Sequence, residues 1–293
     1  MINITLMWFT LAVLAGMADA FRDAAAKRAA RNVPGLLVAW SYVILTLPFF
    51  VPALFAGPEQ EIPHHFWGLL SAISLLHVLG NLLLVEALRI SELSLCTPMV
   101  AFSPVFLLVI GPLLIGEVPT LPGLFGTLLV VSGSYILNLS NKPDGWLEPL
   151  RAIFYERGVQ LMLAVALIWS MTSSIDRLAI PLAGRNFWAG CQLLSISLLS
   201  LPFILKRVPA GIALNKQKML ALLPVGLLNA LGFLFYLGAV VRAPVLYVLC
   251  LKRLSILFSL LLARIFFEEQ LTKARIAGAS VMLAGVVTIS LWG

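Results

Sequence analysis

The residues of this chain best suited to hold a charged ligand are an adjacent lysine and arginine, Lys252 and Arg253. They follow the start of an apolar run near Ala243 by about ten residues, a helical depth of about 15 Å that is close to the middle of a bilayer. Ionisable side chains at that depth cost about 2.5–3.5 kcal/mol each on insertion scales, so a functional role is the first interpretation. Arginine presents a planar fork to oxyanions and lysine a compact charge. The pair therefore predicts an anion-binding site.

The surroundings of this pair leave a second interpretation open. Lys252, Ser255 and Ser259 recur at i, i+3 and i+7, so they share one helical face that could line a cavity. Arg253 is rotated by about 100° from that face and meets a different neighbour. In the alternative interpretation the pair is structural, because it neutralises Asp176 or binds carbonyl groups at a kink.

An acidic residue, Asp176, lies in another apolar run and has polar neighbours at helical spacing. The residues of that helical face are Trp169, Thr172, Ser173 and Asp176. Three roles fit Asp176: it could neutralise the basic pair, carry a coupled proton, or cap the helix and pair with Arg177 near the lipid headgroups. The sequence does not choose between them.

Two further stripes of polar and aromatic residues have helical spacing, Ser74, His77 and Asn81 in one run and Asn229, Phe233 and Tyr236 in another. Histidine titrates near neutral pH, so His77 suits a substrate contact, and a hydrogen bond between helices is the equal alternative. The second stripe has an aromatic face suited to an organic ligand. These residues complete the set of candidates for substrate binding.

Helices must position these residues, because the composition is that of a membrane protein. Of the 293 residues, 61% are hydrophobic and 11% are charged, with a mean hydropathy of +1.02, whereas a soluble domain has about 25% charged residues. A helix crosses the hydrocarbon layer with about 20 apolar residues. The sequence therefore predicts an all-α integral membrane protein. Its ten transmembrane helices are expected at about residues 4–21, 34–56, 66–88, 94–115, 120–139, 158–180, 186–205, 218–240, 243–266 and 272–292.

The fourth of these runs contains Pro98, Pro104 and Pro112. Each proline removes a backbone donor and favours a kink, and broken helices are tolerated in a membrane where they line a cavity. The run predicts either a flexible gate or a static bend.

Other classes of function lack their signatures. Cys96, Cys191 and Cys250 are odd in number and lie inside apolar runs without metal or redox spacing, so packing is their expected role. The sequence has no HExxH motif, no paired aspartates in a GxGD setting and no phosphate-binding loop. We therefore expect that the protein is not an enzyme and that it binds neither a metal ion nor a cofactor.

Lysine and arginine are concentrated in the connections after the first, third, fifth, seventh and ninth runs. The connection after the first run holds Arg22, Lys27, Arg28 and Arg31. Cytoplasmic loops are enriched in these residues, which predicts a multi-pass protein of the cytoplasmic (inner) membrane with both termini extracytoplasmic. The net charge of +7 follows from this bias, so no nucleic-acid partner is expected.

The chain also contains an internal duplication. Glu117 and Glu269, Gly126 and Gly278, and Gly133 and Gly285 are each 152 residues apart, and the same offset aligns residues 11–13 with 163–165, Leu-Ala-Val in both. The predicted organisation is a first repeat at residues 1–140, an interfacial linker at 141–157 and a second repeat at 158–293. Because five helices is an odd number, the repeats must run through the membrane in opposite senses, as in many secondary transporters.

These residues resemble the drug/metabolite transporter superfamily, and within it proteins with two EamA-type repeats. The stretches that carry the resemblance are Glu86-Ala87-Leu88, Ser103-Pro104-Val105-Phe106, Gly116-Glu117 and Phe267-Glu268-Glu269, with the glycines named above. The resemblance covers essentially the whole chain. It implies a ten-helix alternating-access carrier that does not hydrolyse ATP and has a central cavity between the halves.

The basic pair resembles that of plastid sugar-phosphate translocators, where the family assigns it to substrate phosphate. This chain departs from that pattern, since the repeat counterpart of Lys252 is Val100 and the fourth run contains no basic residue. A general anion or carboxylate is therefore expected rather than a doubly charged phosphate.

The expected function is secondary active transport of a small anionic or zwitterionic organic metabolite. The alternative is a flippase for a lipid-linked anionic substrate on the same fold. The expected partners are the small-molecule substrate and the lipid bilayer. The sequence leaves open whether the protein is a monomer or a homo-oligomer.

Overall fold

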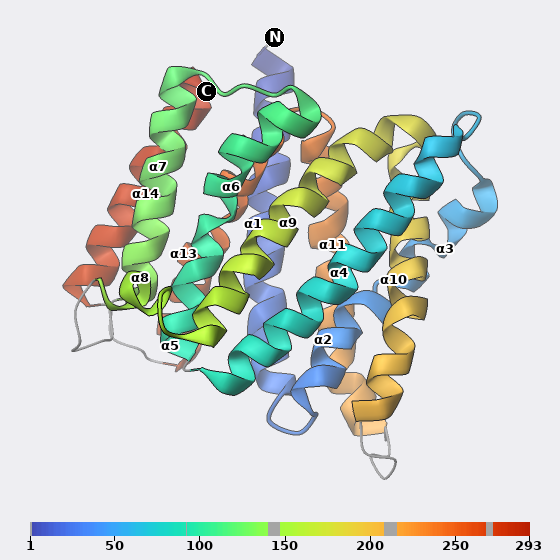
Figure 1. Cartoon of the computed structure of the whole chain (residues 1–293), viewed down its shortest axis with the longest axis horizontal. Coiled ribbons are helices and arrows are strands. Elements are labelled where there is room, and N and C mark those ends of the chain that lie inside the picture. The colour runs from blue at the N-terminus through green and yellow to red at the C-terminus, as the bar shows by residue number, and fades with distance from the viewer. Residues whose placement is uncertain (1, 92, 140–146, 208–215, 268–271) are drawn as a thin grey trace.

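The computed structural model describes residues 2–91, 93–139, 147–207, 216–267 and 272–293, and within these ranges the chain is helical with no β-strand. The helices form one bundle, in which the two termini lie at the same end (Figure 1). We call this the terminal end. The opposite end, where α1 finishes with Lys27 and Arg28 and α11 begins at Lys216, is called the basic end.

The helices of the first half are α1 (Ile2–Ala29), α2 (Gly35–Ile44), α3 (Leu47–Ala56), α4 (His64–Ile90), α5 (Leu93–Cys96), η1 (Thr97–Phe102), α6 (Ser103–Ile110), η2 (Gly111–Ile115) and α7 (Leu121–Leu139). After the short α8 (Glu148–Ala152), the second half contains α9 (Arg157–Ala183), α10 (Arg185–Arg207), α11 (Lys216–Val240), α12 (Val245–Lys252), α13 (Ser255–Phe267) and α14 (Lys273–Trp292).

Within the described residues, eight helical segments are long and apolar enough to cross a membrane, and Leu121–Leu137 is a shorter apolar helix. The bounds expected from the sequence agree with the helices of the structure within a few residues, except at the end of the first. There α1 continues to Ala29, so Arg22, Lys27 and Arg28 belong to the helix and their assignment to a loop is wrong. The alanines after Asp23 are strong helix formers, and no glycine or proline interrupts them before Pro34.

Three of the apolar runs are broken helices. The second is interrupted between α2 and α3, and the ninth between Lys252 and Ser255. The fourth begins with α5 and then changes from a 3-10 helix (η1) to an α-helix (α6) to a π-helix (η2), with Pro98, Pro104 and Pro112 in the first turns of these last three pieces. The predicted kinks are confirmed, and those of the fourth and ninth runs fall at equivalent positions of the two repeats.

The two halves pack with an approximate two-fold relation. The most extensive contacts join α7 to α14, α1 to α11 and α4 to α9. The repeat offset makes α9 the counterpart of α1 and α11 the counterpart of α4, so the last two pairs are one contact made twice. The third pair, α7 with α14, joins a helix to its own counterpart. The central helices of each half therefore pack on the other half.

Glycines bring α7 and α14 together in opposite directions. A Cβ atom on Gly126 would lie 2.9 Å from the carbonyl oxygen of Gly285, and one on Gly133 would lie 2.6 Å from that of Gly278. The backbones are thus in direct contact, as small residues permit in membrane helix pairs. Because equivalent helices run antiparallel, the repeats are inverted.

Some sequence predictions stay outside the described part of the chain. Residues 141–146 of the predicted linker and the repeat-motif residues Glu268 and Glu269 are not described. The described part of the linker holds α8, and Leu147 and Phe154 on either side of it are exposed. Its interfacial location and the domain boundaries stay predictions.

Replacing Gly133 with leucine should destabilise the protein by at least about 1–3 kcal/mol, because the added side chain has no space between α7 and α14. The unfolding temperature of the detergent-solubilised protein measures this. Gly68→Leu is the matched control, since a Cβ on helical Gly68 meets no atom within 4 Å. Equal effects of the two substitutions would contradict the contact.

Candidate functional site

Four charged side chains meet between α1 and α12, and we call them the ionic cluster: Asp19, Arg22, Asp23 and Lys252. The Lys252 Nζ atom lies 3.2 Å from Asp19 Oδ2. Arg22 donates to Asp19 Oδ1 at 2.7 Å and to Asp23 Oδ1 at 2.8 Å. Asp19 therefore pairs with two cations, one on its own helix and one from the other half.

The break in the ninth run positions Lys252. The residue ends α12, and α1 packs against this break because Gly16 has no side chain: a Cβ there would lie 2.9 Å from the carbonyl oxygen of Lys252. Asp19 is one helical turn further along α1, on the same face as Gly16. The close approach at Gly16 thus brings the carboxylate of Asp19 to the ammonium group of Lys252.

Aromatic rings cover the two cations. Lys252 Nζ lies 4.7 Å from the centroid of the Tyr236 ring, and the Arg22 guanidinium lies 5.0 Å from that of Tyr42. Phe233 stacks on Tyr236 with 6.3 Å between ring centroids. Such rings attract cations through their electron-rich faces, and they add an apolar wall beside the charges.

Asn229 connects the ionic cluster to the break in the second run. Its side-chain oxygen accepts from Arg22 at 3.0 Å, and its amide group donates to the carbonyl of Tyr42 at 2.7 Å and to Thr46 Oγ1 at 3.0 Å. Thr46 lies in the interruption between α2 and α3. The predicted stripe of Asn229, Phe233 and Tyr236 therefore does face the charged residues.

Arg253 points away from the ionic cluster to the fourth run. Its Nη2 atom donates to the carbonyl of Val100 at 2.8 Å and also to Ser103 Oγ. In a continuous α-helix the N–H of residue 104 would donate to that carbonyl, and proline has none. In the 3-10 turn the backbone N–H of Ser103 donates to it instead, and Arg253 is an additional donor. Arg253 thus binds a carbonyl at a kink, the structural alternative expected from the sequence, while its neighbour Lys252 faces the carboxylate.

Asp176 is buried and bonded to neutral groups. It accepts from Trp188 Nε1 at 2.8 Å and from the Tyr236 hydroxyl at 3.2 Å. Pairing with Arg177 is wrong, since Arg177 binds Glu117. The carboxylate within ion-pair distance of Lys252 is Asp19 rather than Asp176, which instead accepts from the tyrosine whose ring covers Lys252.

The other predicted residues lie apart from the ionic cluster. His77 Nδ1 is 3.1 Å from the carbonyl oxygen of Ile73 in its own helix, and Asn81 lines a separate cavity of about 50 Å³. Trp169 packs against the buried group that contains Met99. Ser255 begins a new helix after the break, so the face that it was expected to share with Lys252 is interrupted.

Sequence reasoning missed three of the four residues of the ionic cluster, Asp19, Arg22 and Asp23. A signal was present, because an acidic residue inside an apolar run is a functional candidate by default. Ending the first helix at Phe21 moved two of these residues into a loop. Within the described ranges, no group of three His, Cys, Asp or Glu side chains is arranged to hold a metal ion.

A second ion pair joins three elements at the terminal end, and we call it the latch. Glu117 accepts from Arg177 Nε at 3.0 Å and from the backbone N–H of Val245 at 2.9 Å. Arg177 also donates to the carbonyl of Val240 at 2.6 Å. The latch therefore ties the connection after η2 to α9 and to both ends of the connection between α11 and α12.

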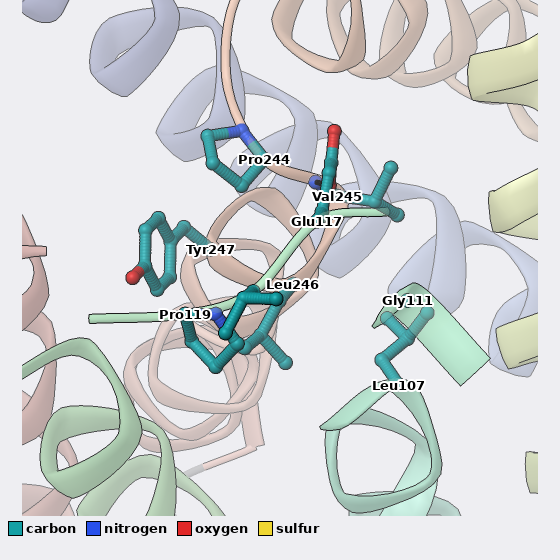
Figure 2. A pocket seen from close by; sticks show the side chains of 9 residues that line it. Leu107, Gly111, Glu117, Pro119, Pro244, Val245, Leu246 and Tyr247 are labelled. Carbon is teal, nitrogen blue, oxygen red and sulfur yellow. Dashed lines mark hydrogen bonds between the residues drawn. The ribbon is translucent and has the colours of Figure 1, made fainter. Parts of the chain in front are cut away.

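The bundle is closed next to the latch. Figure 2 shows Pro119 and Leu246 between Tyr247 on one side and Leu107 and Gly111 on the other. The hollow among them has a volume of about 10 Å³, the room of one water molecule. This hollow is therefore too small for an organic solute.

Exposure increases from the ionic cluster toward the basic end. Along α1, the exposed fraction of the side chain is 11% at Asp19, 17% at Arg22 and 52% at Asp23. Lys252 is 26% exposed. Along α1, the charged side chains of the ionic cluster are thus less buried toward the end of the helix at Ala29.

Glu117→Gln should lower the stability of the protein by about 1–3 kcal/mol, because it removes the charge that holds Arg177 and weakens the bond to Val245. Thermal unfolding in detergent measures the loss. Glu86→Gln is the control: it affects a more exposed pair with Arg89, and exposed pairs contribute about 0–1 kcal/mol. A control effect as large as that of Glu117→Gln would contradict the bridging role of the latch.

Comparisons with known proteins place this fold. A search of the curated proteins finds no match to this chain. One solved structure, described only as "Crystal structure of protein", is similar with a TM-score of 0.77 and 18% sequence identity, over 99% of this chain and 98% of that one. At that identity the likeness shows the fold alone. The model of the EamA-like transporter family matches residues 6–139 and again residues 156–291. The chain therefore belongs to the EamA-like transporter family, a family of membrane transporters.

Proposed function

We propose that this protein is a secondary active carrier of a small zwitterionic or anionic organic metabolite, which it binds at the ionic cluster. The observation that carries the proposal is the pairing of Lys252 with Asp19 between the two inverted halves. In this proposal ten helices span the cytoplasmic membrane, with the basic end in the cytoplasm and both termini outside. A carboxylate of the substrate takes the place of Asp19 at Lys252.

The charge balance of the site favours a substrate without net charge. Within the ionic cluster, Asp19 and Asp23 balance Arg22 and Lys252. The basic and the acidic residue beside the cluster, Arg253 and Asp176, are opposite in type. A dianion would add two uncompensated charges to a site shielded from water, where unpaired charges are strongly unfavourable. A zwitterion adds none, since its carboxylate can bind Lys252 and its ammonium group the released Asp19. The charge count therefore ranks zwitterions above phosphate esters.

The rings beside the cluster favour an organic body on the substrate. Tyr236 and Phe233 form a stacked pair next to Lys252, and Phe50 packs edge-on against Phe233 with 5.8 Å between centroids. Binding sites for small molecules combine such apolar walls with a few polar groups that fix orientation. An amino acid with a large apolar side chain satisfies both parts of this site.

Alternating access requires the latch to open. Two observations support a conformer open toward the basic end: the hollow beside the latch has a volume of only about 10 Å³, and Asp23 is the most exposed acidic residue of the ionic cluster at 52%. Release of Glu117 from Arg177 and Val245 would free the connections that meet there. We propose that the structure is the conformer open to the basic end and that the latch separates it from the opposite conformer.

One observation favours the flippase alternative. A groove of about 570 Å³ opens between α3, α10 and α11, and its lining is apolar apart from Glu59 and Asn186. Phe50 forms part of this groove and contacts Phe233, so an acyl chain there would be close to the aromatic wall of the site. A lipid-linked anion could use both.

The test is transport by the purified protein in liposomes with labelled L-phenylalanine, malate and glycerol 3-phosphate, and with a fluorescent phospholipid for the flippase alternative. Uptake of phenylalanine is expected, and Lys252→Gln should reduce it about 10- to 100-fold through loss of a charged hydrogen bond. Arg89→Gln, at an exposed pair, should leave uptake unchanged.

Wild-type uptake by Lys252→Gln would remove Lys252 from the site. Phospholipid movement without uptake of any soluble compound would favour the flippase. Preference for glycerol 3-phosphate over phenylalanine would contradict the charge argument.

A further inference from the structure

We infer that this carrier can change between its two conformations with no substrate bound, because Asp19 replaces the substrate at Lys252. It therefore performs net transport rather than obligatory exchange. The inference rests on the proposed carrier function. It adds the mode of transport, and its main test needs no substrate.

In the empty site, the charge of Lys252 needs a partner from the protein. A carrier whose binding group is a lysine in the membrane must change conformation with that charge compensated, since an unpaired buried charge disfavours the closed intermediate. Here Asp19 Oδ2 lies 3.2 Å from Lys252 Nζ, and the Tyr236 ring covers the same ammonium group at 4.7 Å. The empty site is neutralised from within.

In the loaded site, Asp19 needs a partner other than Lys252. When a substrate carboxylate occupies Lys252, Asp19 keeps the Arg22 guanidinium at 2.7 Å on its own helix. Arg22 in turn is fixed by Asp23 at 2.8 Å and by Asn229 at 3.0 Å. Asp19 is therefore paired in both states, and neither the loaded nor the empty carrier leaves a charge without a partner.

The bond between Asp19 and Lys252 joins the two halves of the carrier. Asp19 belongs to the first repeat and Lys252 to the second, so their bond crosses the interface between the halves. Arg253, adjacent to Lys252, is held by the carbonyl of Val100 and does not compete for Asp19 at hydrogen-bond distance. Asp176 is bonded to Trp188 and Tyr236. Asp19 is thus the carboxylate placed to replace the substrate.

Asp23→Asn provides a matched control. Asp23 is an aspartate on the same helix and pairs with the same arginine, yet its partner is Arg22 and not Lys252. Asp19→Asn leaves Lys252 without a counter-ion in the empty protein, whereas Asp23→Asn leaves the bond between Asp19 and Lys252 in place. A difference between these variants therefore reports the counter-ion and not a general effect of lost charge.

The experiment measures how often the empty protein opens at the terminal end. Leu107 lines the hollow beside the latch and is 2% exposed, so a cysteine at this position should react with a membrane-impermeant maleimide only when that end opens. The background is Leu107→Cys with Cys191→Ala, in substrate-free liposomes. Val118→Cys, at a residue 78% exposed at the same end, identifies the molecules that face the reagent.

We expect the background protein to be labelled, and Asp19→Asn to slow labelling at least about tenfold, because the unpaired Lys252 keeps the protein in the conformer where water reaches it. Asp23→Asn should slow labelling by a clearly smaller factor, because Asp23 is 52% exposed and water can solvate the charge that its loss leaves on Arg22. The double variant Asp19→Asn with Lys252→Met, which removes both charges, should recover labelling and shows that the single variant was folded.

Absence of labelling in the background protein would overturn the inference, and so would labelling of Asp19→Asn at the background rate. Failure of the double variant to recover would also overturn it. Each outcome is independent of which solute the carrier moves.

Transport provides the second readout. In liposomes loaded with tritiated L-phenylalanine, Asp19→Asn should reduce efflux into phenylalanine-free buffer at least about tenfold more than it reduces efflux into buffer that contains unlabelled phenylalanine. Equal loss of both would overturn the inference. If the wild-type protein does not move phenylalanine at all, the proposed substrate is wrong and the labelling of Leu107→Cys still decides the mode.

Discussion

The salt bridge between Asp19 and Lys252 is the interaction on which the centre of this structure depends. A lysine in the middle of a membrane requires an opposite charge nearby, and here that charge belongs to the other half of the protein. The requirement fixes the rotation of α1, makes a glycine necessary at position 16, and brings Arg22 and Asn229 into the same network. A substrate that binds Lys252 acts directly on the contact between the halves.

The contacts at the broken helices follow from the lack of water inside a membrane. A proline or a change of helix type leaves carbonyl groups without their usual donors, and in a membrane these must be satisfied by other parts of the protein. Asn229 donates to Tyr42 at one break and Arg253 to Val100 at another. The two adjacent basic residues therefore have different partners, because Lys252 faces a carboxylate while Arg253 is an additional donor to a backbone carbonyl at a kink.

The duplication supplies a symmetric scaffold, and its divergence supplies the site. Equivalent helices make equivalent contacts, and α7 packs on its counterpart α14 through glycines that both repeats share. The charged residues of the ionic cluster have no such symmetry. The counterparts of Asp19, Arg22 and Lys252 at the repeat offset are Met171, Ser174 and Val100. In the proposed carrier function, the symmetric framework allows two related conformations, and the asymmetric ionic cluster is the one binding site common to both.

The sequence by itself determined the helices, the proline kinks, the inverted repeats and the unusual position of Lys252. These features depend on hydropathy, backbone chemistry and spacing, which are local properties of the chain. Only the tertiary structure decided that Asp19 rather than Asp176 neutralises Lys252, that Arg177 binds Glu117 and that Arg22 belongs to a helix. The physical reason is that successive residues of a helix point about 100° apart. The partner of a buried charge therefore depends on how neighbouring helices are rotated and how deeply each is placed. The sequence of one helix alone does not determine either.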